Sequence, residues 1–137
     1  MSVASDAVTA RRGPLVVAGG VVAAIVAASV ADTVLALLAL AAGAPDDFRP
    51  LKASSYIFLT AVGVVAGAIG WAIVRKVSKD PAALVRWLVP TLVVVSFVPD
   101  FLLFGDGGAT GVGALLLMHV AVAAVAVFTY RKVMPLS

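Results

Sequence analysis

Three ionisable side chains stand inside apolar stretches of the sequence, where they could take part in chemistry. Asp32 and Asp100 are carboxylic acids, and His119 is the single histidine of the chain. An ionisable group inside a membrane is costly, so it suggests a function. Counted along ideal helices, the aspartates lie ~24–27 Å and His119 ~16 Å from one end of the predicted bundle. We interpret the three side chains as one candidate catalytic site.

A structural role is the alternative for each of these residues. Asp100 could be an interfacial residue at the end of its helix. Asp32 could bond to a neighbouring helix through Thr33 or Tyr56, and His119 could be a packing residue with a satisfied hydrogen bond. The sequence leaves these alternatives open.

Other side chains at similar depths could bind a substrate beside this site. Tyr56 and Thr60 are four residues apart, so they share one helix face. Phe97 and Phe101 have the same spacing around Asp100. The predicted substrate-binding residues are Ser29, Thr33, Tyr56, Thr60, Phe97 and Phe101.

Long apolar runs carry all of these residues. The chain is 63% hydrophobic and 12% charged, whereas a soluble domain has about 25% charged residues. The runs have the length of membrane-spanning helices, so we expect a multi-pass protein of the cell membrane. We predict an all-α fold, an antiparallel four-helix transmembrane bundle that makes residues 1–137 a single integral membrane domain. The predicted spans cover about 14–41, 53–74, 82–104 and 112–130.

The basic residues predict the orientation of the bundle. With four spans, both termini lie on the same side, and eight of the ten basic residues fall there. Since Lys and Arg collect at cytoplasmic helix ends, we predict that both termini are cytoplasmic. The eight residues are Arg11, Arg12, Arg75, Lys76, Lys79, Arg86, Arg131 and Lys132, against Arg49 and Lys52 on the other side.

Proline and glycine indicate where helices begin, bend and end. Asp80 and Pro81 form a helix-start signature, with Asp80 as the N-cap. Pro99 removes a backbone donor next to Asp100 and should kink the third span. Residues 105–111, GDGGATG, predict a tight turn before the fourth span.

Aromatic and small residues suggest how the helices pack. Trp71, Trp87 and Tyr130 fall near the predicted cytoplasmic ends, which is typical of an interfacial aromatic belt. Gly63 and Gly67 have the spacing that lets membrane helices approach closely. We favour packing inside the bundle over a homodimer seam, although a homodimer stays an alternative.

Several kinds of chemistry find no support in the sequence. There is no cysteine, so thiolate chemistry is absent. All seven acidic residues are aspartates, so any carboxylate chemistry must use one of them. One histidine and two separated aspartates lack the spacing of a dedicated metal site, and no glycine-rich phosphate loop exists. We therefore expect no metal and no cofactor. Nucleic-acid binding is not expected either, because the basic residues flank the membrane.

Two functions fit the buried acids. A carboxyl that burial keeps neutral can donate its proton to a lipophilic substrate, and aromatic faces stabilise cations. This combination suits the cyclisation of a prenyl chain, with Asp32 or Asp100 as the acid and His119 as orienting partner or final base. Alternatively, the same residues relay protons in a small proton-coupled transporter. A non-catalytic accessory subunit is a third interpretation. The expected partners are membrane lipid and a lipophilic small molecule.

Three short motifs carry a resemblance to a known family. They are ADT (31–33), FVPD (97–100) and LMHV (117–120). With them, residues 14–133 resemble small four-helix membrane proteins of actinobacteria grouped as a family of unknown function, DUF6069. In size and number of spans the chain is also similar to small bacterial membrane-bound terpene cyclases, which cyclise prenylated indoles and cyclodipeptides. That second resemblance implies metal-free, proton-initiated cyclisation.

Overall fold

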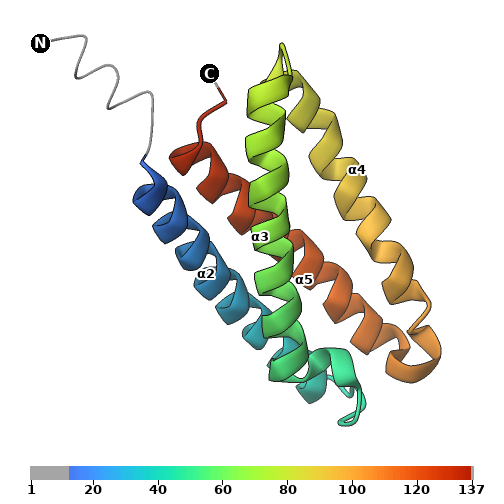
Figure 1. Ribbon diagram of the computed structural model, residues 1–137. Coiled ribbons are helices and arrows are strands. Elements are labelled where there is room, and N and C mark those ends of the chain that lie inside the picture. Colours follow the sequence, from blue (N-terminus) through green and yellow to red (C-terminus); the bar gives the residue numbers. More distant parts are fainter. Residues whose placement is uncertain (1–12, 137) are drawn as a thin grey trace, which may run out of the picture.

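The computed structural model describes residues 13–136, and Figure 1 shows them as a bundle of long helices. The four long helices in this range are each long and apolar enough to cross a membrane, which confirms the predicted all-helical membrane fold. Arg11 and Arg12, counted in the charge asymmetry, lie outside the described residues. The elements are α2 (Pro14–Ala41), η1 (Arg49–Leu51), α3 (Ala53–Val77), α4 (Pro81–Phe101) and α5 (Phe104–Val133).

The helix starts follow local sequence chemistry. Pro14 and Pro81 occupy the first turns of α2 and α4, where the missing N–H costs no hydrogen bond. Asp80 caps α4, and its Oδ1 accepts a hydrogen bond from the backbone N–H of Ala83 at 3.1 Å. The predicted N-cap is therefore confirmed. Helix α4 continues through both Pro90 and Pro99 as far as Phe101.

The connection between α4 and α5 agrees with the prediction in part. The backbone N–H groups of Asp106 and Gly107 both bond to the carbonyl of Leu103 and form a single helical turn from Phe104. This first turn precedes a break at Gly108, where φ is 65° and ψ is −174°, so the expected turn at 105–111 falls on an interruption inside α5. Glycine adopts this left-handed conformation without the cost that a Cβ would impose.

Small side chains bring α2 close to α5, its most extensive partner. Ala24 and Ala28 are 1% and 0% exposed, and they share a helix face with Asp32 and Ala36. Near the start of α2, a Cβ at Gly20 would lie only 2.7 Å from a methyl carbon of Val133. Membrane helices gain stability from this kind of close approach.

Helix α4 packs much more loosely than the other three. It buries two of its residues, Val85 and Asp100. In Figure 1 the yellow α4 stands apart from the green α3 over much of its length. The apolar core instead lies in two clusters towards the two ends of the bundle, one around Val64, Trp71 and Tyr130 and the other around Phe48 and Leu115.

Two of the three residues assigned to an aromatic belt are core residues instead. Trp71 is 5% exposed, and its Nε1 donates to the carbonyl of Met134 at 2.9 Å. Tyr130 is 4% exposed, and its hydroxyl donates to the carbonyl of Val64. The belt interpretation is therefore wrong for this pair, whose polar atoms find partners inside the protein. Trp87, at 75% exposed, remains compatible with a membrane interface.

Candidate functional site

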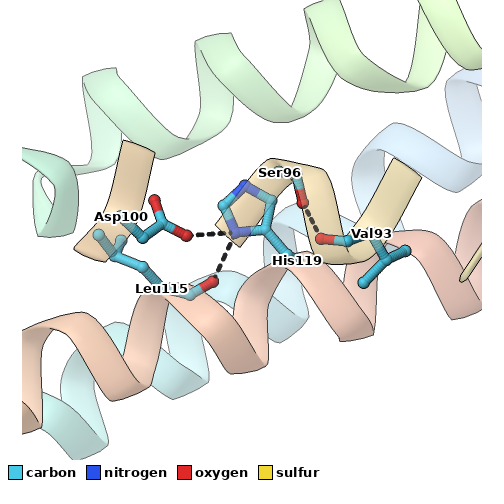
Figure 2. A network of polar contacts seen from close by, with 5 residues as sticks. All are labelled: Val93, Ser96, Asp100, Leu115 and His119. Atoms are coloured by element: carbon cyan, nitrogen blue, oxygen red, sulfur yellow. Dashed lines mark hydrogen bonds and ion pairs between the residues drawn. The ribbon is translucent and has the colours of Figure 1, made fainter. Parts of the chain in front are cut away.

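Asp100 and His119 form a polar pair between α4 and α5, shown in Figure 2. The Nδ1 atom of His119 lies 2.8 Å from Oδ2 of Asp100 and 2.8 Å from the backbone carbonyl of Leu115. Because the carbonyl can only accept, this geometry favours the tautomer in which Nδ1 carries the hydrogen. Figure 2 places Nε2 on the far edge of the ring, away from both partners. That second nitrogen is therefore free to exchange a proton.

Asp32 has a different set of partners. Its Oδ2 accepts a hydrogen bond from Thr60 at 2.6 Å, which joins α2 to α3. Its other oxygen, Oδ1, is buried and has no hydrogen-bond partner among the described residues, and the same holds for the hydroxyl oxygen of Ser29 and for Oδ2 of Asp100, which has only the close contact with His119. Asp32 is 1% exposed, so an ionised form would carry a bare, desolvated oxygen.

A second hydrogen bond supports the α2–α3 contact beside Asp32. The hydroxyl oxygens of Thr33 and Tyr56 lie 2.9 Å apart, and Thr33 also donates to the carbonyl of Ser29 at 2.8 Å. Polar bonds between membrane helices hold neighbouring side chains in register. The position of Asp32 is therefore fixed by two adjacent interhelical bonds.

Both acids and the histidine line one groove of about 820 Å³. This volume lies within the range of about 300–1,000 Å³ that is usual for small-molecule sites. Its walls are mostly apolar and come from α3, α4 and α5, so the groove follows the loose side of α4. None of the described residues that line it is a lysine or arginine. The polar side chains of the lining are Asp32, Tyr56, Thr60, Trp71, Ser96, Asp100, His119 and Tyr130.

The other predicted substrate-binding residues do not line the groove. Ser29 and Thr33 lie on α2 near Asp32 in the sequence and are absent from the lining. Phe97 packs its ring edge-on to His119, with 6.1 Å between the ring centroids. Phe101 is 55% exposed and lies outside the groove lining, so its expected role beside Asp100 has no geometric support.

Sequence reasoning missed part of the groove wall. Gly63, Gly67 and Gly70 all line it, whereas their spacing suggested helix packing. Gly67 does pack, because a Cβ there would lie 2.8 Å from the hydroxyl oxygen of Tyr130. Gly63 and Gly70 have no atom within 4 Å of such a Cβ, so they leave open space. Their alignment with Thr60 on one face of α3 is the sequence feature that could have placed them in the groove wall.

Comparison with known families assigns the chain to one family. The model of a family of unknown function, DUF6069, matches residues 10–135. The protein belongs to this family. The resemblance carried by the ADT, FVPD and LMHV motifs is thus confirmed, and the match includes all four long helices. Neither the curated proteins nor the solved structures contain a match. The function of this DUF6069 protein must therefore be argued from its site.

A second hollow lies at the opposite end of the bundle from the acids. It has a volume of about 490 Å³ and is lined by Arg86 at the start of α4 and Arg131 at the end of α5. Their chain neighbours, Val85 and Tyr130, line the main groove. The molecule thus carries acids towards one end of the groove and guanidinium groups beside the other.

Proposed function

We propose that the protein is a membrane-bound terpene cyclase that starts the cyclisation of a lipophilic prenylated substrate by proton transfer. The observation that supports this most is the pair of unlike acid sites facing one apolar groove. Both acids carry a buried oxygen without a hydrogen bond, but only that of Asp100 lies beside an imidazole, 2.8 Å from Nδ1 of His119. Environments that separate two acids in this way suit one for giving a proton and the other for stabilising a base.

In the proposed reaction Asp32 is the acid. Its carboxyl proton bonds to a terminal alkene carbon of the substrate, using the alkene π electrons, and leaves a tertiary cation. A second alkene attacks that cation, which forms the ring bond and moves the positive charge. Loss of a proton from carbon to Nε2 of His119 forms the final double bond. After the product leaves, water that enters the groove carries the proton from His119 back to Asp32, because both side chains line it.

Asp100 has a supporting role in this scheme. Its carboxylate holds Nδ1 of His119 and stabilises the imidazolium that forms when Nε2 takes the proton. The apolar walls keep water from capturing the cation. Because the carboxyl group supplies the proton, the scheme needs no metal ion.

Solvent deuterium tests the proposal directly. Membranes that contain the protein are incubated with prenylated indoles in D₂O, and the products are analysed by mass spectrometry. Cyclisation should give an isomer of the substrate that retains one deuterium at the protonated carbon. Asp106→Asn is the matched control, because Asp106 lies on α5 outside the groove lining and is exposed. An isomer without deuterium would contradict protonation as the first step.

The proposal includes an orientation in the membrane. The helices would run antiparallel, with both termini in the cytoplasm, as the basic residues indicate. Because the chain has no cysteine, single-cysteine variants can test this with an impermeable maleimide on intact cells. Asp47→Cys, in the α2–α3 connection, should react from outside. Lys79→Cys, in the α3–α4 connection, should react only after the cells are opened. The opposite pattern would reverse the orientation.

The loose packing of α4 favours one other function. A helix that buries only Val85 and Asp100 could move, and its movement would make or break the contact with His119. Such a contact could couple protons to transport. Proteoliposomes would then show solute uptake driven by a pH gradient and lost in Asp100→Asn. Uptake that is indifferent to the gradient would exclude this function.

A further inference from the structure

The groove has chemically opposite ends. Towards one end, Asp32, Asp100 and His119 face its interior. Beside the other end, Arg86 and Arg131 line the second hollow, next to the groove residues Val85 and Tyr130. Along ideal helices, Asp100 lies ~21 Å from Arg86, and His119 lies ~18 Å from Arg131. A ligand that spans these ends must be long, apolar in the middle and anionic at one end.

The middle of the groove is open enough for a chain to pass. Gly63 and Gly70 line it with no atom within 4 Å of where a Cβ would stand. They lie on the same face of α3 as Thr60, which holds Asp32. The buried, unpartnered Oδ1 of Asp32 marks where a reacting group would arrive.

The two arginines come from different helices, which suits them to a phosphate group. Guanidinium groups bind phosphate oxygens through paired, charge-assisted hydrogen bonds. The described groove lining itself contains no lysine or arginine. At the acid end one exposed arginine, Arg49, neighbours the lining residue Pro50, whereas two arginines line the hollow at the other end. The paired guanidinium groups therefore favour that end for a phosphate.

We propose that the substrate is a prenyl phosphate or diphosphate that binds tail-first, with its phosphate at Arg86 and Arg131 and its terminal alkene at Asp32. This inference rests on the proposed function, which makes Asp32 the proton donor at the acid end of the groove. It adds the substrate class and the binding direction. It also accounts for acids that lie far from the cytoplasmic side, because the phosphate head stays there while only the apolar tail reaches them.

Fluorescence quenching tests the direction without any turnover. The chain has two tryptophans: Trp71 lines the groove near Tyr130, and Trp87 is exposed. In a Trp87→Phe protein in nanodiscs, Trp71 is then the reporter. Geranylgeranyl diphosphate brominated beside its phosphate should quench it strongly. The same lipid brominated at the far end of the tail should quench it weakly. The reverse order would overturn the proposed direction.

Two sets of variants test the ends and the middle. Arg86→Gln with Arg131→Gln should weaken binding of the diphosphate by at least about tenfold and leave geranylgeraniol unchanged, because hydrogen bonds to charged groups are lost. Arg75→Gln, on α3 and outside both linings, is the control. Equal affinity for the diphosphate in the wild type, the Arg86→Gln/Arg131→Gln double variant and Arg75→Gln would overturn the phosphate site.

Gly63→Phe fills open space near Thr60 and should exclude long tails while shorter prenyl diphosphates still bind. Gly19→Phe is its control, because Gly19 lies on α2, outside the groove and with nothing within 4 Å. Unchanged binding of long tails in Gly63→Phe would contradict the path along α3. If phosphatidylglycerol displaced the brominated geranylgeranyl diphosphate, the arginines would form a phospholipid site, and this result would also overturn the proposal.

These binding results stand apart from catalysis. Oriented binding with no deuterated product from either prenylated indoles or geranylgeranyl diphosphate in D₂O would reject the cyclase and keep the ligand class. A deuterated product from prenylated indoles, together with no oriented binding of the diphosphate, would keep the cyclase and reject the prenyl diphosphate as its ligand.

Discussion

Asp32 and Asp100 are the same residue type in two settings, and the helices that carry them explain the difference. Asp32 belongs to a row of alanines on α2, including Ala28 at 0% exposed, that packs tightly. Its hydrogen bond to Thr60 links two closely packed helices. Asp100 stands on α4, which buries one other residue, Val85. One acid is held by packing, and the other is held mainly by its polar partner.

This difference suggests a division of roles. A tightly packed site can keep a proton donor in a fixed position relative to a substrate, which general acid catalysis requires. A loosely packed helix suits the wall through which a lipid enters from the side. Within residues 13–136, α4 has one polar side-chain contact with another helix, the Asp100–His119 pair.

The largest expected effect is that of removing the fixed acid. Asp32→Asn keeps the size of the side chain and can still accept the hydrogen bond from Thr60. It loses the proton, so product formation should fall by ~10²–10⁴-fold, the usual contribution of a general acid. Product mass spectrometry measures the loss. Full activity in Asp32→Asn, with Asp106→Asn also active, would mean that Asp32 is not the general acid.

A smaller effect is expected at the paired acid. Asp100→Asn leaves the imidazole in place but weakens its orientation, which should cost product formation about tenfold, or ~1.4 kcal/mol. If Asp100 acts through His119, the loss should disappear in a His119→Gln background. Independent, additive losses would mean that Asp100 acts on the substrate itself.

The sequence predicted the secondary structure better than the partners of its side chains. Apolar run lengths located four helices, and Asp80 with Pro81 located the start of α4. The turn expected at 105–111 is present as a break at Gly108, but it is shorter than predicted. Backbone bonds to Leu103 form one helical turn before the break, which the glycine content alone does not reveal.

Side-chain burial was harder to predict because it depends on neighbouring helices. Depth counting brought Asp32, Asp100 and His119 to one groove. It could not give the rotation of each helix about its axis, so Phe101 was assigned to the site although it points outward. The same ambiguity placed Trp71 and Tyr130 in a belt, since a helix-end aromatic residue can face lipid or protein. Hydropathy is similar on all faces of a membrane helix and does not separate these cases.

The contrast in packing can be tested on stability alone. Ala28→Leu adds volume at a position of 0% exposure on α2 and should lower the free energy of unfolding by about 1–3 kcal/mol. Val95→Leu on α4, where Val95 is 58% exposed, should change it by less than about 0.5 kcal/mol. Unfolding in mixed micelles titrated with dodecyl sulfate measures both. Equal losses would mean that α4 packs as tightly as α2.

A small loss of stability is also expected from a single hydrogen bond on the tight side. The Tyr130 hydroxyl donates to the carbonyl of Val64 and so joins α5 to α3. Tyr130→Phe should cost about 0.6 kcal/mol, the average for such bonds between membrane helices, because the unfolded chain in the membrane finds other partners. The ring contact with Trp71, at 5.4 Å between centroids, is retained. Tyr130→Leu removes that contact too and should cost about 0.5–1.5 kcal/mol more. If Tyr130→Phe alone proved as costly as Ala28→Leu, the tight side would depend on its polar bonds rather than on its small residues.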